Sequence, residues 1–434
     1  MKTIVAKFGG TSLADAAQFK KVRAIIEADP SRRFIVASAP GKRNPEDHKV
    51  TDLLYRCRDL AAHGGDPAPV LEEIRARFAG IIEELGVDFD LDAELAAICG
   101  HLRERDYMAS RGEYLNAKIL SAYLGIPFID AAECVRFVRA GLPDYETTND
   151  LMAFALRGAT RVIIPGFYGT DQSGVIRTFT RGGSDVTGSL VARAVSADLY
   201  ENWTDVPGML FADPRVVDNP RTVERITYRE LRELSYLGAS VLHEDAVFPV
   251  RKAGIPINIR DTNCPEEHGT MIVPVENERS WETVVTGIAG KPGFCCVSLE
   301  KGMMNSEVGF GAKLLTIFAE HGVSFEHCPS GIDTMSVVVQ REAFAPQREA
   351  ILREIEEDLH PDYIAVDDSI ALIAVVGHGM VHSKGISARV FRAMANARIN
   401  VRLIDAGPGE MNIIFGVAEE DCNDALRALN NALG

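Results

Sequence analysis

The stretch Lys7-Phe8-Gly9-Gly10-Thr11-Ser12 decides how the chain begins to fold. It follows the β-prone run 3–6 and precedes residues 13–28, which are predicted to form a helix. Two glycines between a strand and a helix let the backbone approach a phosphate closely, and a helix N-terminus presents unpaired N–H groups. Lys7 would add a positive charge at the same place. The stretch therefore predicts an anion site, although an ordinary turn beside a surface lysine fits the same residues.

The composition is that of a globular protein with two or three domains: 434 residues, 46% of them hydrophobic and 25% charged. A formal net charge of −16 argues against nucleic acid or an anionic membrane surface as a partner, but not against a nucleotide. No apolar run approaches the length of a membrane span, the N-terminus lacks a signal-peptide pattern, and the eight cysteines show no metal-binding spacing. We therefore expect a cytoplasmic protein with reduced thiols, no nucleic-acid partner and no membrane association.

Strands and helices alternate over the first ~270 residues, which predicts one α/β domain with a mostly parallel sheet. A charged, helix-periodic stretch from about 52 to 110 is predicted to be a helical insertion. Arg111-Gly112-Glu113 is predicted to open a helix over 114–124. In Arg181-Gly182-Gly183-Ser184-Asp185, a second glycine pair precedes a helix predicted over 186–196. The chain thus offers two glycine pairs for one anion.

The last third of the chain contains an internal repeat. Residues 309–315 align with residues 385–391, and the match continues at the same 76-residue offset through 335–339 and 411–415. Each copy is predicted to be a ferredoxin-like βαββαβ unit. The Gly/Pro run at 289–293 is predicted to separate two short strands. Tandem small repeats after a larger α/β domain indicate a regulatory module.

Four separated motifs resemble those of the aspartate kinase family (aspartokinases) within the amino-acid kinase superfamily. They are residues 7–12, 111–113, 181–185, and 203–208 followed by Asp213-Pro214-Arg215. The paired repeats are similar to tandem ACT domains. The resemblance implies an amino-acid-kinase three-layer sandwich over 1–278 and a regulatory part over 279–434. In that part the first repeat spans about 294–366, and the second spans about 280–293 plus 367–434.

The resemblance also implies an activity, which is ATP + L-aspartate → ADP + 4-phospho-L-aspartate, the first step towards lysine, threonine and methionine. Mg²⁺ would accompany ATP, an end-product amino acid would inhibit, and the ACT domains would build a homodimer or a dimer of dimers. Two alternatives stay open. The chain could be another amino-acid kinase of the superfamily, or an amino-acid-sensing ACT binding protein with an inactive kinase half.

The chemistry selects a few residues for catalysis. A substrate carboxylate is already ionised at neutral pH, so the protein must align the reactants and neutralise charge, without a general base. Lys7, Arg181 and Asp185 are the predicted catalytic residues, with Asp185 orienting Lys7 or holding Mg²⁺ through water; no residue is predicted to bind a metal directly. Glu113 would bind the substrate ammonium and Arg181 the α-carboxylate. The plainer readings are a glutamate in the first turn of a helix, a helix N-cap for Asp185, and a surface charge for Arg181.

The remaining substrate contacts are predicted at Ser38, Thr51 and Ser184, where Thr51 is also a predicted helix N-cap and Ser184 could touch either substrate. The residues predicted to bind the nucleotide are Lys7, Gly9, Gly10, Thr11, Ser12, Gly182, Gly183, Thr204, Asp205, Arg215 and Asn263. The chain departs from the family pattern at Thr180, Leu210, Ser240 and Glu244, which leaves details of nucleotide contact open.

An effector site is predicted in the first repeat, formed by a loop before a helix and by the facing strand and turn. Its residues are Met304, Ser306, Val308, Gly309, Ser324, Phe325, Glu326, Ser330, Ile332 and Asp333. Glu326 or Asp333 would bind a cationic side chain, which favours lysine over threonine as the effector. A purely structural module is the alternative.

Overall fold

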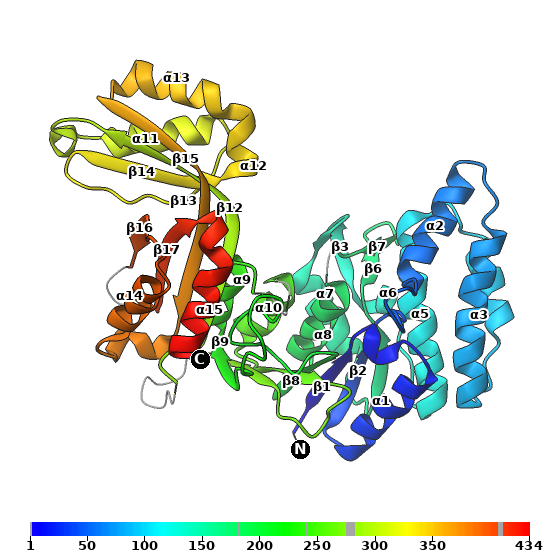
Figure 1. Ribbon diagram of the computed structural model, residues 1–434. Coiled ribbons are helices and arrows are strands. Elements are labelled where there is room, and N and C mark those ends of the chain that lie inside the picture. The colour runs from blue at the N-terminus through cyan, green and yellow to red at the C-terminus, as the bar shows by residue number, and fades with distance from the viewer. Residues whose placement is uncertain (1, 181, 240–241, 243, 275–282, 407–410) are drawn as a thin grey trace. The chain divides into compact units, whose positions relative to one another are not determined.

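The computed structural model describes residues 2–180, 182–239, 242, 244–274, 283–406 and 411–434, in two compact units (Figure 1). The first unit comprises Met1–Met209, Thr222–Tyr228 and Val241–Glu276; the second comprises Leu210–Arg221, Arg229–Ser240 and Asn277–Gly434. The predicted boundary near residue 278 lies outside the described residues and stays a prediction, as do the predicted repeat boundaries.

The first unit is built on a seven-stranded sheet with the order β5-β2-β1-β8-β10-β11-β9. Neighbouring strands run parallel except β10 and β11, so the predicted α/β class with a mostly parallel sheet is confirmed. All five residues of β1, near the centre of the sheet, are buried. The strands are β1 (Ile4–Phe8), β2 (Arg32–Ala37), β5 (Val162–Pro165), β8 (Leu199–Thr204), β9 (Arg225–Thr227), β10 (Ile257–Asp261) and β11 (Thr270–Val273).

Helices cover both faces of this sheet (Figure 1). Side chains of α1 (Ala16–Ala28) and α5 (Arg105–Leu124) form one hydrophobic core with Ala6, Phe8 and Ile35. Because side chains alternate along a strand, Lys7 points to the opposite face, where α8 (Gly183–Ala194) packs against β1, β2 and β8. The first unit also contains a smaller sheet with the order β4-β3-β6-β7 and further helices: β3 (Arg136–Arg139), β4 (Leu142–Pro143), β6 (Tyr168–Asp171), β7 (Ile176–Thr178), α6 (Ala131–Cys134), α7 (Tyr145–Ala155) and α10 (Glu244–Ala253).

The helical insertion consists of α2 (Val50–Ala62), α3 (Ala68–Leu85) and α4 (Leu91–Cys99), separated by turns at residues 63–67 and 86–90. Two predictions at helix starts are wrong. Thr51 is not an N-cap, because Lys49 takes that position and Val50 is already helical and fully buried. Residues 111–113 do not open a helix, because α5 begins at Arg105, with Met108 and Ala109 packed in the core.

The second unit contains a six-stranded sheet with the order β13-β14-β12-β15-β17-β16, which confirms the ferredoxin-like part. Gly309 and Gly385 have left-handed φ angles of 88° and 90° at the starts of α11 and α14, so the 76-residue repeat also holds in the backbone. The elements are β12 (Gly287–Glu300), β13 (Phe325–His327), β14 (Thr334–Gln340), β15 (Tyr363–Val376), β16 (Leu403–Asp405), β17 (Asn412–Ala418), α9 (Tyr228–Tyr236), α11 (Phe310–Glu320), α12 (Arg341–Phe344), α13 (Arg348–Leu359), α14 (Ile386–Asn396) and α15 (Cys422–Leu433).

The Gly/Pro run at 289–293 does not separate two strands, so that prediction is wrong. The strand β12 runs unbroken through it, and its register with β15 shifts between Lys291 and Phe294. Pro292 lies in this irregularity, where its missing N–H removes no hydrogen bond from the ladder. Both β12 and β15 are 14 residues long and pair with each other along their length; β12 also pairs with β14, and β15 also pairs with β17.

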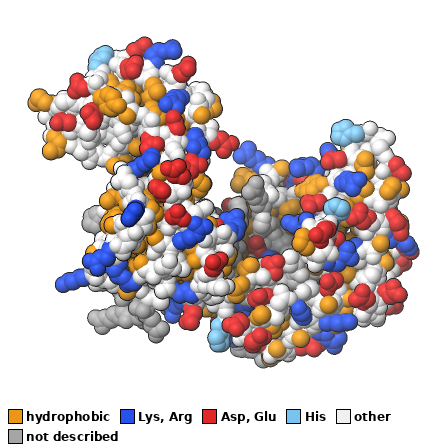
Figure 2. All heavy atoms as spheres, in the orientation of Figure 1, with side chains coloured by type: hydrophobic (Ala, Val, Ile, Leu, Met, Phe, Trp, Pro, Cys, Tyr) orange, Lys and Arg blue, Asp and Glu red, His pale blue; other side chains and the backbone are white. Residues whose placement is uncertain are grey.

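The surface carries mixed charges. On the face drawn in Figure 2, acidic and basic side chains are interspersed over each unit, with hydrophobic side chains between them. Among the described residues, the helices are all too short or too polar to cross a membrane.

Candidate active site

Lys7 lies at the centre of the candidate site. It is only 7% exposed, and its Nζ lies 2.5 Å from Asp185 Oδ1 and 3.4 Å from Asn202 Oδ1. Asn202 Nδ2 donates to the same Asp185 oxygen at 2.9 Å. The pairing of β1 with β8 sets Lys7 opposite Asn202, and the first turn of α8 brings Asp185 to both. Asp185 is therefore not the N-cap of α8, a position that Gly182 holds.

Asn202 is a residue that the sequence reasoning missed. It is a buried polar side chain in a strand whose neighbours Glu201 and Trp203 are also buried. A buried amide needs hydrogen-bond partners, and this one finds them in Asp185 and Lys7. The strand pairing that brings these groups together was the missing information.

The first glycine pair is held tightly. The Gly9 N–H donates to the Trp203 carbonyl at 2.8 Å, and a Cβ on Gly9 would lie 3.6 Å from Lys7 Nζ. The predicted helix start at residue 13 is wrong, because a short 3₁₀ turn (Thr11–Leu13) follows the glycines and α1 begins at Ala16 with Asp15 as its cap. Ser12 is buried, with its Oγ 2.7 Å from Thr262 Oγ1. At the first glycine pair, an anion could therefore bind backbone groups of the loop close to Lys7. The N-terminus of α1 does not follow the glycines directly.

The second glycine pair does lie at a helix N-terminus. Gly182 has a left-handed φ of 56° and α8 begins at Gly183, where a Cβ would lie 2.6 Å from Phe167. Ser184 is buried and packs so closely against Gly166 that a Cβ on Gly166 would lie 2.6 Å from it. Arg181, which precedes Gly182, lies outside the described residues, so the predicted roles of Arg181 stay predictions. The positive end of α8 is the stronger candidate anion site of the two.

Glu113 is a buried carboxylate in the interior of α5. Burial raises its pKa to about 8, although a hydrogen bond from the Ala39 backbone and the charge of Arg111 oppose that rise. Within the described part of the chain, Glu113 Oε2 has no hydrogen-bond partner. Because Glu113 lies more than two turns inside the helix, a first-turn role in stabilising α5 is ruled out. A buried acceptor without a donor fits the ammonium group of a ligand.

The loop after β2 joins Glu113 to Lys7. The Ser38 N–H donates to the Phe8 carbonyl at 3.2 Å, next to Lys7. Asn116, which sequence reasoning also missed, donates through Nδ2 to the Ser38 carbonyl at 2.7 Å. A Cβ on Gly112 would lie 2.8 Å from the Ala39 Cβ, so only glycine allows this close approach of α5 to the loop. Lys7, Ser38 and Glu113 are therefore brought to one region.

Of the other residues predicted to bind the nucleotide, Thr204, Asp205 and Asn263 lie in the first unit and Arg215 lies in the second. Thr204 and Asp205 follow Asn202 at the end of β8, and the Thr204 carbonyl accepts from the Thr262 N–H at 2.9 Å. The Asn263 side chain accepts from Lys21 Nζ at 2.7 Å and from Gln18 Nε2, both on α1. Arg215 belongs to the second unit, where its exposed guanidinium pairs with Asp213 at 2.6 Å.

The predicted effector residues lie at two ends of β14 in the second unit: the loop and turn of 303–309 and 330–333 lie at its start, and Phe325 and Glu326 lie beside its end. The Asp333 carboxylate accepts from the Met303 N–H at 2.8 Å, and the Ile332 carbonyl accepts from the Asn305 N–H at 3.1 Å. These bonds tie the loop before α11 to the turn before β14. The Glu326 carboxylate accepts from Gln340 Nε2 at 2.8 Å. Met304 is buried beneath the loop, whereas the Val308 side chain is 98% exposed.

Comparison with known proteins places both units in known families. A model of the amino acid kinase family matches residues 2–261, and a model of the ACT domain matches residues 373–433. Aspartokinase 3 of Bacillus subtilis is 39% identical to the chain, over 98% of the chain and 97% of that protein.

Solved structures give the same picture. The aspartate kinase of Clostridium acetobutylicum superposes with a TM-score of 0.90 at 46% identity, over 99% of this chain and 100% of that one. Escherichia coli aspartokinase III superposes at 25% identity over the whole of both chains. Its TM-score is 0.74 for the complex with aspartate and ADP (R-state) and 0.71 for the complex with lysine and aspartate (T-state).

Proposed function

The chain belongs to the aspartokinase family of amino acid kinases, and we propose that the region around Lys7 and Glu113 is the site of its phosphoryl transfer. As an aspartate kinase with ACT domains, the protein transfers phosphate from ATP to aspartate under allosteric control. The observation that carries the assignment of the site is the buried Glu113 carboxylate, whose Oε2 has no partner among the described residues. An amino-acid substrate supplies the ammonium group that this carboxylate requires.

Substrate binding uses three charges on aspartate. The ammonium binds Glu113, the α-carboxylate binds Arg181, and the side-chain carboxylate points toward the two glycine pairs. Hydroxyl groups of Ser38, Thr51 and Ser184 line the pocket. Ser38 and Ser184 are buried, which supports contact with a small, desolvated substrate. This arrangement places the attacking oxygen by fixing the other end of the molecule.

The transfer itself depends on charge neutralisation. The side-chain carboxylate of aspartate attacks the γ-phosphorus of ATP, the bond to the β-phosphate oxygen breaks, and 4-phospho-L-aspartate and ADP form. Lys7 neutralises charge on the moving phosphoryl group, and Asp185 with Asn202 holds its Nζ in place. Backbone N–H groups near Gly9, Gly10 and the start of α8 bind phosphate oxygens.

The base and sugar of the nucleotide are assigned to the neighbouring loops. Thr11 and Ser12 continue the first glycine loop, and Thr204 and Asp205 lie at the end of the adjacent strand β8. Asn263 would have to leave Lys21 and Gln18 to contact ATP, and Arg215 would have to leave Asp213. Both remain proposals on the resemblance alone.

Mg²⁺ fits this site only as a companion of the nucleotide. Among the described residues, no group of three histidine, cysteine or acidic side chains could hold a metal ion. Asp185 uses Oδ1 for both Lys7 and Asn202, so Oδ2 is the carboxylate oxygen that would accept from a metal-bound water. When bound with ATP, Mg²⁺ supplies positive charge to the phosphate oxygens.

We propose lysine as the inhibitor, bound in the first repeat. The lysine complex of E. coli aspartokinase III supports this choice. Asp333 accepts from a backbone N–H, whereas Glu326 accepts from the Gln340 side chain, which can rotate away, so Glu326 is the better partner for a side-chain ammonium. Met303, Val308 and Ile332 expose hydrophobic side chains on the loop and turn that Asp333 ties together, and we propose that they form one patch. A second copy of the chain would cover that patch, giving a homodimer that sedimentation velocity can detect.

Release of ADP with L-aspartate, measured with and without lysine, tests the function. Turnover that lysine suppresses is the expected result. Turnover with glutamate or acetylglutamate in place of aspartate would move the chain elsewhere in the superfamily. Suppression by threonine or methionine but not by lysine would contradict the assigned effector.

Lys7→Ala separates catalysis from regulation. Loss of a preorganised charge at the transition state is expected to lower kcat by about 10²–10³-fold or more. Lysine binding, measured by calorimetry, should be unchanged because the effector residues lie in the second unit. Lys20→Ala, an exposed lysine on α1, is the matched control. Loss of both activities in Lys7→Ala would contradict this division of labour.

A further inference from the structure

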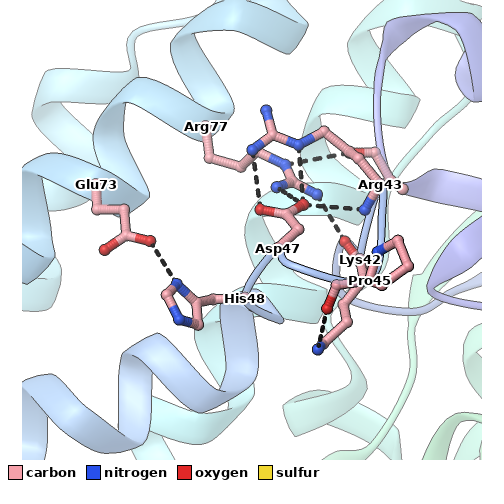
Figure 3. A network of polar contacts seen from close by, with 9 residues as sticks. Lys42, Arg43, Pro45, Asp47, His48, Glu73 and Arg77 are labelled. Atoms are coloured by element: carbon pink, nitrogen blue, oxygen red, sulfur yellow. Dashed lines mark hydrogen bonds and ion pairs between the residues drawn. The ribbon is translucent and has the colours of Figure 1, made fainter.

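Arg77 is a buried arginine of α3 that the proposed mechanism does not use. It is 8% exposed, and its guanidinium donates to three acceptors (Figure 3). Nη1 donates to Asp47 Oδ2 at 2.6 Å, Nη2 to the Gly41 carbonyl at 2.6 Å and Nε to the Ala14 carbonyl at 3.2 Å. One side chain of the insertion therefore binds the segment after the first glycine loop and two points of the loop between β2 and α2.

The charges in this network are matched. A buried guanidinium is costly unless it is paired, and here Asp47 supplies the opposite charge. Asp47 also accepts from Arg43, and the hydrogen bonds from Arg43 and Arg77 hold the pKa of Asp47 well below its usual range. Asp47 therefore stays ionised throughout the pH range of an enzyme assay.

A second contact from α3 reaches the same loop at the surface. His48 Nδ1 lies 3.0 Å from Glu73 Oε1, and Glu73 precedes Arg77 by one helical turn (Figure 3). Both side chains are largely exposed, so this contact contributes little by itself. It nevertheless shows that α3 contacts the loop at two residues one turn apart, with the buried contact at Arg77.

Gly41 is the point at which this loop meets the first glycine loop. Its N–H donates to the Gly10 carbonyl at 2.8 Å. A Cβ on Gly41 would lie 2.6 Å from the Gly10 carbonyl carbon and 2.7 Å from the Thr11 nitrogen, so the two backbones are in contact. Two residues earlier, Ala39 lies against Glu113. The loop therefore contacts the phosphate side of the site at Gly41 and the amino-acid side at Ala39.

We infer that Arg77 is a positioning residue for the phosphoryl transfer. By holding the Gly41 carbonyl it fixes the distance between the loop that binds ATP and the loop that binds aspartate. The inference rests on the proposed roles of Gly10 and Glu113. A misplacement of about 1 Å between reacting groups can cost about 10²-fold in rate, so the spacing of the two loops matters to catalysis. The helical insertion then serves the active site directly through α3.

The test compares two arginines of the same helix in the full-length protein. Arg77→Met removes all three hydrogen bonds, whereas Arg75→Met removes an exposed arginine that pairs with Asp92. Arg77→Met is expected to lower kcat/KM for aspartate by about 10²-fold, with a rise in the KM for aspartate and a fall in kcat. Arg77→Lys keeps the charge near Asp47 but cannot reach three acceptors, so it should give an intermediate loss. Arg75→Met should stay within about twofold of wild type.

A purely structural role would give a different result. It would lower the melting temperature of Arg77→Met but leave kcat and KM unchanged at a temperature where circular dichroism shows the variant folded. That outcome would overturn the inference. If Arg77→Met does not fold, Arg77→Lys and Asp47→Asn are measured in its place. Wild-type values of kcat and KM in both of these variants would also overturn the inference. Wild-type turnover in the same assay reports on the proposed function separately, since its absence would refute the function whatever the variants do.

Discussion

Glu113 and Lys7 show how burial sets the chemistry of single residues. Lys7 is buried with an acidic partner, so its charge is held at one place and is ready for a phosphoryl group. Glu113 is also buried, but within the described residues its Oε2 has no hydrogen-bond partner. Its pKa rises to about 8 because the charged form is poorly solvated. In the empty site the Glu113 carboxyl group is therefore mostly neutral near pH 7.

The raised pKa of Glu113 predicts a pH dependence of substrate binding. The carboxyl group is protonated below about pH 8 in the empty site, and only its ionised form attracts an ammonium group. We expect kcat/KM for aspartate to rise between about pH 6 and 8 and then to level off. Because the folded pKa lies above the unfolded value, the substrate-free protein should also lose stability as the pH rises through 8.

Glu113→Gln provides the control for that profile. It should lower kcat/KM by about 10–100-fold, because a hydrogen bond to a charged partner is lost, and it should remove both the rise with pH and the loss of stability. A profile in Glu113→Gln that still rises toward pH 8 would assign the titration to another group.

At the scale of elements, features with a local sequence signal could be predicted, whereas contacts between segments distant in the sequence could not. The strand–glycine units at residues 7–12 and 181–185 and the repeated glycines 309 and 385 could be recognised, because φ > 0 and close backbone approach require glycine. The start of α5 was missed, since Gly112 inside a helix resembles a helix boundary until its contact with Ala39 is known. Asn116 and Asn202 act through partners distant in sequence, so no local pattern could reveal them.

The contact between α5 and the loop at Ala39 predicts a cost for any side chain at residue 112. Gly112→Ala introduces a Cβ 2.8 Å from the Ala39 Cβ, and we expect a loss of about 1–3 kcal/mol in the free energy of unfolding, with a higher KM for aspartate. Gly80→Ala, in the interior of α3, meets no atom within 4 Å and should instead stabilise by about 0.5–1 kcal/mol. Urea unfolding measures both; equal effects in the two variants would argue against a close contact.

At the scale of the whole molecule, the division of the chain does not follow the order of the sequence. Two segments from within the kinase part of the sequence, Leu210–Arg221 and Arg229–Ser240, are grouped with the second unit. In that unit, the buried Glu230 of α9 accepts from Thr286 Oγ1 and from the His378 N–H. The segment that carries Arg215 is bound to the same unit, since the Phe211 carbonyl accepts from the Ile288 N–H at 2.8 Å and the Val216 carbonyl accepts from Arg427 Nε at 3.1 Å. We therefore expect this segment to follow a rearrangement of that unit on effector binding.

Effector binding in the second unit can be tested without disturbing catalysis. Glu326→Gln removes the carboxylate proposed to bind the lysine ammonium, and we expect the lysine concentration for half inhibition to rise by about 10-fold or more. Turnover without lysine should be unchanged. Glu320→Gln, at the exposed end of α11, is the matched control. Unaltered inhibition in Glu326→Gln would place the ammonium site elsewhere, with Asp333 as the next residue to change.

The two long central strands of the second unit have a consequence for cooperativity. Since β12 and β15 pair with each other along their length, while β14 pairs with one half of β12 and β17 with the opposite half of β15, the backbone hydrogen bonds of the unit form one continuous sheet. Removing one repeat would leave half of each strand as an unpaired edge, which invites aggregation. The pair should accordingly unfold in a single calorimetric transition.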